Sequence, residues 1–124
     1  MELSKLPVFN RLRMLYVQFE KSTQKVPINI KRGPIFQIET WLIEMLDNIQ
    51  LAHESELEMR LICIRENIRL LREVKIKVRT LQWLHIIHDK AYAAIIREEE
   101  NVAAQLAGWE KSTVREMERL TPGV

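Results

Sequence analysis

Four arginines in the segment 57–79 are spaced so that a helix would carry them on one side. They are Arg65, Arg69, Arg72 and Arg79. Successive residues of an α-helix are about 100° apart, so these side chains fall on one arc, where guanidinium groups can bind the phosphates of a nucleic acid. The alternative is a solvated face that is held by its own ion pairs, such as Glu73 with Lys77 four residues on.

Residues that could bind a metal or catalyse a reaction are few. His85 and His88 are three residues apart, but no Glu lies three residues before any histidine, as the di-iron bundle pattern requires. Glu98 and Glu99 fall near the inner face of their predicted helix, so a carboxylate or metal enzyme built on them and His88 is one hypothesis. The chain has no Gly-rich phosphate loop, Ser/His/Asp set or zinc-ligand spacing. We therefore expect a non-enzymatic protein without metal or cofactor.

Length and composition indicate one intracellular domain. The chain has 124 residues, enough to bury a core without disulfides. Its single cysteine, Cys63, cannot form an internal disulfide and is expected to act as a small buried hydrophobe. No apolar run is long enough to span a membrane, and the N-terminus lacks the layout of a signal peptide. We expect no membrane association.

Apolar residues repeat at helical spacing in four segments, which must position these groups. We predict an up-down-up-down four-helix bundle, because the connections are mostly short. Thr80 is the best candidate for the cap of the last helix, so a tight reversal is placed near residues 78–81. That helix should end near Glu118, before Pro122 and Gly123. The predicted helices span about 5–23, 34–52, 56–78 and 81–118 of the single domain 1–124.

More apolar side chains are present than one bundle core needs. In the helix 56–78 the predicted core face is Leu57, Leu61, Ile64, Ile68, Leu71 and Val78. Further apolar residues lie off the predicted core faces and indicate a partner surface or self-association. The alternative is a wide core arc. The predicted interface residues are Phe36, Trp41, Ile43, Met59, Leu70, Val74 and Trp109, with Cys63 on the same strip as Met59.

Charge alternates along the chain although the net charge is only +2. Residues 1–32 and 60–79 each hold seven Lys or Arg against two Glu, whereas residues 39–59 hold six acids and no Lys or Arg. Residues 98–118 are again acidic. The first and third helices are therefore predicted to be basic and diagonal in the bundle, and the second and fourth acidic.

The order of these segments resembles a known family. The pattern is a first helix, a basic loop with Pro27, then IFQIETWLIEMLDNIQLA, LREVKIKV, LQWL and finally AGWEKS at Ala107 to Ser112. It is similar to the four-helix-bundle family of the accessory variability determinant (Avd) proteins of diversity-generating retroelements. That family also contains proteins encoded in intervening sequences of large-subunit ribosomal RNA genes. The resemblance covers roughly residues 8–112.

The resemblance implies a cytoplasmic protein that forms a pentameric barrel of bundles, binds RNA or cDNA and associates with a reverse transcriptase during mutagenic copying. A ribosomal-intervening-sequence protein is the alternative, and it would be an interaction module without nucleic-acid binding. One departure from the Avd pattern is the net charge of only +2, where strongly basic chains are usual. The positions implied to bind nucleic acid are Arg65, Arg69, Arg72, Lys75, Lys77, Arg79, Lys21, Lys25, Lys31 and Arg32.

Overall fold

The computed structural model describes residues 2–121, which are helical apart from short connections. A 3-10 turn, Leu3–Lys5, precedes the first long helix, and the short helix α2 (Ile28–Ile30) and a π-helical turn (Lys31–Ile35) connect the first two long helices. The long helices are α1 (Pro7–Thr23), α3 (Phe36–Glu54), α4 (Leu57–Trp83) and α5 (Asp89–Leu120). Pro7 begins α1, where its missing N–H leaves no hydrogen bond unmade. Pro122 and Gly123, predicted to follow the last helix, lie outside the described residues.

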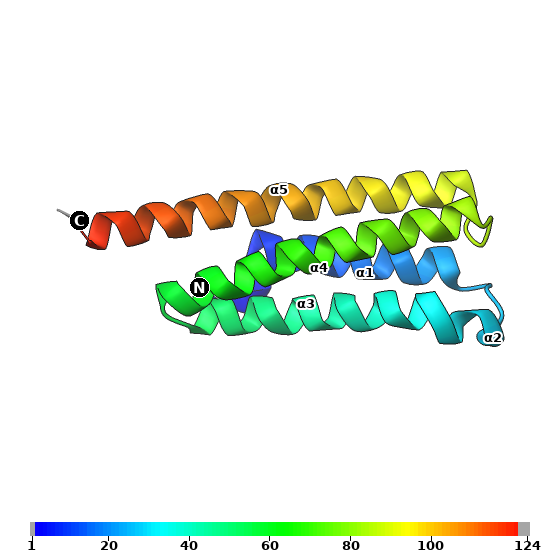
Figure 1. The fold of residues 1–124 in the computed structure, drawn as a ribbon, viewed down its shortest axis with the longest axis horizontal. Coiled ribbons are helices and arrows are strands. Elements are labelled where there is room, and N and C mark those ends of the chain that lie inside the picture. Colours follow the sequence, from blue (N-terminus) through cyan, green and yellow to red (C-terminus); the bar gives the residue numbers. More distant parts are fainter. Residues whose placement is uncertain (1, 122–124) are drawn as a thin grey trace.

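The four long helices form the predicted bundle and run in alternating directions along one axis (Figure 1). α1 and α4 each pack against α3 and α5, so α1 is diagonal to α4 and α3 to α5. The basic helices are therefore on opposite edges, as predicted. α5 has 32 residues, about 48 Å at 1.5 Å per residue, and extends past α1 and α3 (Figure 1).

The core is an apolar cluster built from residues three and four apart on each helix. The apolar repeat of residues 34–52 predicts a core face of Ile35, Ile38, Leu42, Met45, Leu46 and Ile49, and all but the half-buried Leu46 are at most 1% exposed. Burial of such side chains is the main term that stabilises a bundle, about 1.5–3 kcal/mol for each large one. The buried cluster includes Val8, Leu12, Leu15 and Phe19 of α1, Leu71, Val74 and Val78 of α4, and Ile95, Val102 and Leu106 of α5.

The prediction that Leu70 and Val74 lie on an exposed interface strip is wrong. Both are 1% exposed and belong to the core, and Cys63 is also buried. α4 packs against α3 on one flank and α5 on the other, so its buried arc is wider than one narrow seam. The alternative of a wide core arc is confirmed for this helix. Leu57 and Leu61, predicted at the core, are only half-buried.

The reversal before the last helix lies later than predicted. Thr80 does not cap α5, because its hydroxyl donates to the Ile76 carbonyl (3.0 Å) within α4, which continues to Trp83. The N-cap of α5 is His88, whose Nδ1 accepts a hydrogen bond from the Ala91 backbone N–H (3.2 Å). His88 is exposed. Neither Gly nor Pro occurs in this turn, so its position could not be seen in the sequence.

One buried amide fixes the packing of α3 on α4. Asn67 is 1% exposed and its Nδ2 donates to the backbone carbonyl of Met45 (3.0 Å). Its Oδ1 accepts a hydrogen bond from Asn48 Nδ2 (3.0 Å). A buried amide lowers the stability of the fold unless its hydrogen-bond partners are present. The hydrogen bonds of Asn67 therefore favour one register of α3 relative to α4.

None of the helices in residues 2–121 is both long enough and apolar enough to cross a membrane.

Candidate nucleic-acid interface

The residues of α4 that point away from the core form a continuous ridge. We call it the α4 outer ridge: Ile62, Arg65, Arg69, Arg72, Ile76, Arg79 and Trp83, all of them exposed. Their spacing of three and four residues keeps them on one side of the helix. All four arginines of the predicted arc are on this ridge. Its apolar members were not predicted to be exposed: Trp83 is 77%, Ile62 61% and Ile76 57% exposed.

Two of the ridge arginines are ion-paired. Arg65 Nε donates to Glu110 of α5 (3.0 Å), and Arg69 forms a two-point contact with Glu66 through Nη2 (2.6 Å) and Nε (3.1 Å). The hydrogen bond from Arg69 lowers the pKa of Glu66. Exposed ion pairs contribute only about 0.2–1 kcal/mol, so a phosphate can replace either carboxylate.

The second half of the ridge carries its charge without ion pairs. Within residues 2–121, Arg72, Lys75 and Arg79 have no carboxylate within ion-pair distance. Lys75 lies on the flank of the ridge that faces α5. It lines two shallow cavities of about 290 and 300 Å³, one with Arg72 and one with Arg79. This half therefore has the strongest unneutralised positive charge on α4.

Glu99 lies beneath Lys75 in the second of these cavities. It is 2% exposed, and its Oε2 has no hydrogen-bond partner among the described residues. Burial raises the pKa of Glu99 to about 7, the charge of Lys75 opposes this, and Glu100 adds to it. A proton on Glu99 at neutral pH would leave the charge of Lys75 available to a ligand.

Lys77 does not join the outer ridge. Two residues turn a helix by about 200°, so Lys77 points to a different side from Arg79 and is only half-exposed. Lys77 therefore lies on a different helix face from the ridge arginines, because i and i+2 positions do not share a face, and its implied contact with nucleic acid stays a prediction.

The predicted loop cations gather at one end of the bundle. The α1–α3 connection and the α4–α5 turn lie at the same end (Figure 1). Lys21 and Lys25 line a cavity there together with the residues of the turn. Arg32 is exposed, whereas Lys31 is half-buried and its ammonium donates to the Gln24 carbonyl (3.5 Å).

Lys31 also lies near a pair of carboxyl groups between α1 and α3. Burial and a hydrogen bond with Glu20 raise the pKa of Glu39 to about 7, and the charge of Lys31 opposes the shift. Lys31 therefore has a local structural role and contributes less to an external charged surface than Lys25 or Arg32.

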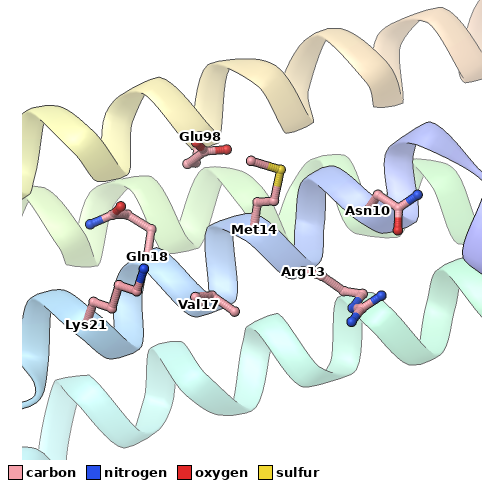
Figure 2. Close-up of a pocket in the computed structure, with 7 residues that line it drawn as sticks. All are labelled: Asn10, Arg13, Met14, Val17, Gln18, Lys21 and Glu98. Carbon is pink, nitrogen blue, oxygen red and sulfur yellow. The ribbon is translucent and has the colours of Figure 1, made fainter.

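The residues of the enzyme hypothesis do not come together. His88 and Glu99 are eleven residues apart on α5, a rise of about 16 Å. Glu98 faces α1 and lines a groove of about 450 Å³ beside Met14 and Gln18 (Figure 2). No group of three His, Cys, Asp or Glu residues in the described chain is arranged to hold a metal. These residues do not form a common site.

The other predicted interface residues differ in exposure. Phe36, Ile43 and Met59 are 42%, 47% and 45% exposed, whereas Trp41 and Trp109 are half-buried and pack against the core. Three of the seven thus present apolar surface to solvent. Met14 and Val17 on α1, about half exposed, were not predicted.

Comparison with known protein families, with curated proteins and with solved structures finds no match to this chain.

Proposed function

We propose that the protein is a non-enzymatic accessory protein of a diversity-generating retroelement that binds RNA or cDNA along the α4 outer ridge. The observation that carries this proposal is the exposed ridge itself: among residues 2–121, Arg72 and Arg79 have no ion-pair partner, and the exposed indole of Trp83 is one turn beyond Arg79. Arginines at this spacing can contact successive phosphates, and an exposed aromatic ring can stack with an unpaired base. In this proposal Lys25 and Arg32 extend the contact to the loop end.

The proposal includes two protein partners. The family resemblance supports a reverse transcriptase as partner and a pentameric assembly. Exposed apolar side chains such as Phe36, Ile43 and Met59 offer surface for these contacts. The nucleic-acid contact is the part that the ridge supports directly.

A second candidate is an interaction module that does not bind nucleic acid. The pairing of Arg65 with Glu110 and Arg69 with Glu66, together with a net charge of +2, favours it. In that case Ile62, Ile76 and Trp83 would contact a protein.

The test measures binding of a structured RNA with single-stranded loops at several salt concentrations. The ridge variant Arg69→Gln/Arg72→Gln/Arg79→Gln is compared with Lys90→Gln/Arg97→Gln/Lys111→Gln, which removes the same charge from exposed positions of α5. The ridge variant should lower the slope of log K against log salt by about 0.7 for each lost single-strand contact, and the α5 variant should change it less. Equal effects of the two variants would contradict a specific ridge.

Light-scattering mass, alone and with the RNA, tests the assembly. Co-purification with a reverse transcriptase of a diversity-generating retroelement tests the partner. A protein that ignores RNA but retains a protein partner would favour the second candidate.

A further inference from the structure

A cavity of about 640 Å³ opens at the end of the bundle, between the α1–α3 connection and the α4–α5 turn. This volume is within the range of about 300–1,000 Å³ that small-molecule sites occupy. Six of its lining side chains can donate hydrogen bonds to an anion: Lys21, Ser22, Gln24, Lys25, His85 and His88. Val26, Pro27 and Ile30 supply apolar wall. The cavity lies beyond the C-terminal end of α4, and none of its lining residues belongs to the α4 outer ridge, although Leu84 directly follows the ridge residue Trp83.

No carboxylate lines this cavity. The acid nearest in sequence to His88 is Asp89, whose Oδ1 accepts a hydrogen bond from Gln82 Nε2 (3.0 Å). Neither Lys21 nor Lys25 is ion-paired within residues 2–121. The described lining of the cavity therefore combines Lys21 and Lys25 with no carboxylate, which favours an anionic ligand. Lys21 also lines a groove with Glu98 and a cavity with Glu20, so the charge of Lys25 is the less offset by nearby acids.

His85 occupies a backbone position that normally belongs to glycine. Its φ is 61°, and it is the one non-glycine residue with positive φ in the described chain. The Ile86 N–H bonds to the Leu81 carbonyl (2.9 Å) and the His85 N–H to the Gln82 carbonyl (3.0 Å). This is the Schellman pattern that ends a helix, with His85 at the left-handed position where glycine is most stable. A strained residue that lines a cavity suggests a role for its side chain there.

His88 has a fixed tautomer. Because its Nδ1 accepts the capping hydrogen bond from Ala91, a neutral imidazole must hold its proton on Nε2. The ring is thus oriented as a hydrogen-bond donor in a residue that lines the cavity. His88 is also the N-cap of α5, whose N-terminal end carries partial positive charge.

We propose that this end cavity binds a phosphate group, with Lys21 and Lys25 providing charge and His85 and His88 donating hydrogen bonds. The phosphate belongs to a free mononucleotide or to the 5′ end of a nucleic-acid strand. This inference goes beyond the proposed function: it shares Lys25 with the nucleic-acid contact proposed above, whereas Lys21, His85 and His88 belong neither to that contact nor to the α4 outer ridge.

The test uses the full chain and three probes: adenosine monophosphate, and one short RNA with either a 5′-phosphate or a 5′-hydroxyl. The key variant is His85→Gly, which removes the imidazole and relieves the strained backbone. It should keep or raise the melting temperature while weakening binding of the phosphate probe at least about tenfold, as expected for a lost hydrogen bond to a charged group. Lys25→Gln should weaken it similarly, and Lys90→Gln, exposed but not lining the cavity, should leave it unchanged.

The outcomes separate the two sources of phosphate. Binding of adenosine monophosphate assigns the cavity to a free nucleotide, and a preference for the 5′-phosphorylated RNA alone assigns it to a strand end. Equal binding of the two RNAs with no binding of the mononucleotide overturns the proposal, as does phosphate binding that His85→Gly and Lys25→Gln leave unchanged. The ridge variant should retain phosphate binding, so a failure of the proposed function is distinguishable from a failure here.

Discussion

The guanidinium Nε of Arg65 on α4 lies 3.0 Å from a carboxylate oxygen of Glu110 on α5. This ion pair ties the first arginine of the α4 outer ridge to the neighbouring helix and neutralises it. The side chains are 59% and 31% exposed, so the pair is in contact with water and is weak. The ridge thus has a paired half, with Arg65 and Arg69, and an unpaired half, with Arg72 and Arg79.

We predict that Glu110→Gln strengthens RNA binding. The substitution frees Arg65 for a phosphate, and an exposed pair of about 0.2–1 kcal/mol corresponds to a gain of up to about fivefold in affinity. Fluorescence anisotropy at fixed salt measures it. Glu116→Gln is the matched control, because it releases Arg119 from a similar exposed pair that involves no ridge residue and changes the net charge by the same amount. Equal gains from both variants would mean that net charge alone governs binding.

The ridge arginines could be predicted because each lies on a simple helical repeat that needs no tertiary information. The core face of α3 followed from the same reasoning. Leu70 and Val74 could not be assigned, since their burial depends on α4 contacting two neighbours, which is a tertiary property. The turn at His85 could not be predicted from the sequence. Glycine usually occupies the left-handed position of such a turn, but in this chain that residue is histidine. The end cavity, which combines residues far apart in sequence, needed the fold.

Removing Leu70 should destabilise the bundle far more than removing an apolar residue of the ridge. Leu70→Ala leaves a cavity in the core and should lower the free energy of unfolding by about 2–5 kcal/mol. Ile62→Ala, at a position 61% exposed, should change it by at most about 0.5 kcal/mol. Urea denaturation of both variants checks the comparison. Similar losses of unfolding free energy for the two variants would contradict the assignment of Leu70 to the core.

Asn67→Ala is expected to lower the free energy of unfolding by about 2 kcal/mol. The change leaves the Met45 carbonyl and the Asn48 amide without their buried partner, and each unsatisfied group carries a desolvation cost. Denaturant unfolding gives the value, and Asn29→Ala, at an exposed position of the short helix α2, is the control with an expected change of at most about 0.5 kcal/mol. A loss no larger than that of the control would show that the amide does not fix the α3–α4 packing.

Glu99 should make the stability of the bundle depend on pH. Burial raises its pKa from 4.5 to about 7, so between these values the folded chain holds a proton that the unfolded chain has lost. The contribution of Glu99 to the free energy of unfolding is therefore greatest below pH 4.5. It is lost as the pH rises from 4.5 through 7. The groups that face Glu99 act in opposite directions, since Lys75 favours the charged form and Glu100 disfavours it.

Glu99→Gln removes this titration while keeping a side chain of similar size. It should stabilise the protein by on the order of 2 kcal/mol at pH 8, where the wild type must bury a charge, and by much less at pH 5. Thermal unfolding at the two pH values measures the difference. Glu100→Gln, at an exposed neighbouring position, should show no comparable pH dependence. An equal effect of Glu99→Gln at pH 5 and pH 8 would mean that Glu99 is charged throughout, because Lys75 then compensates its burial completely.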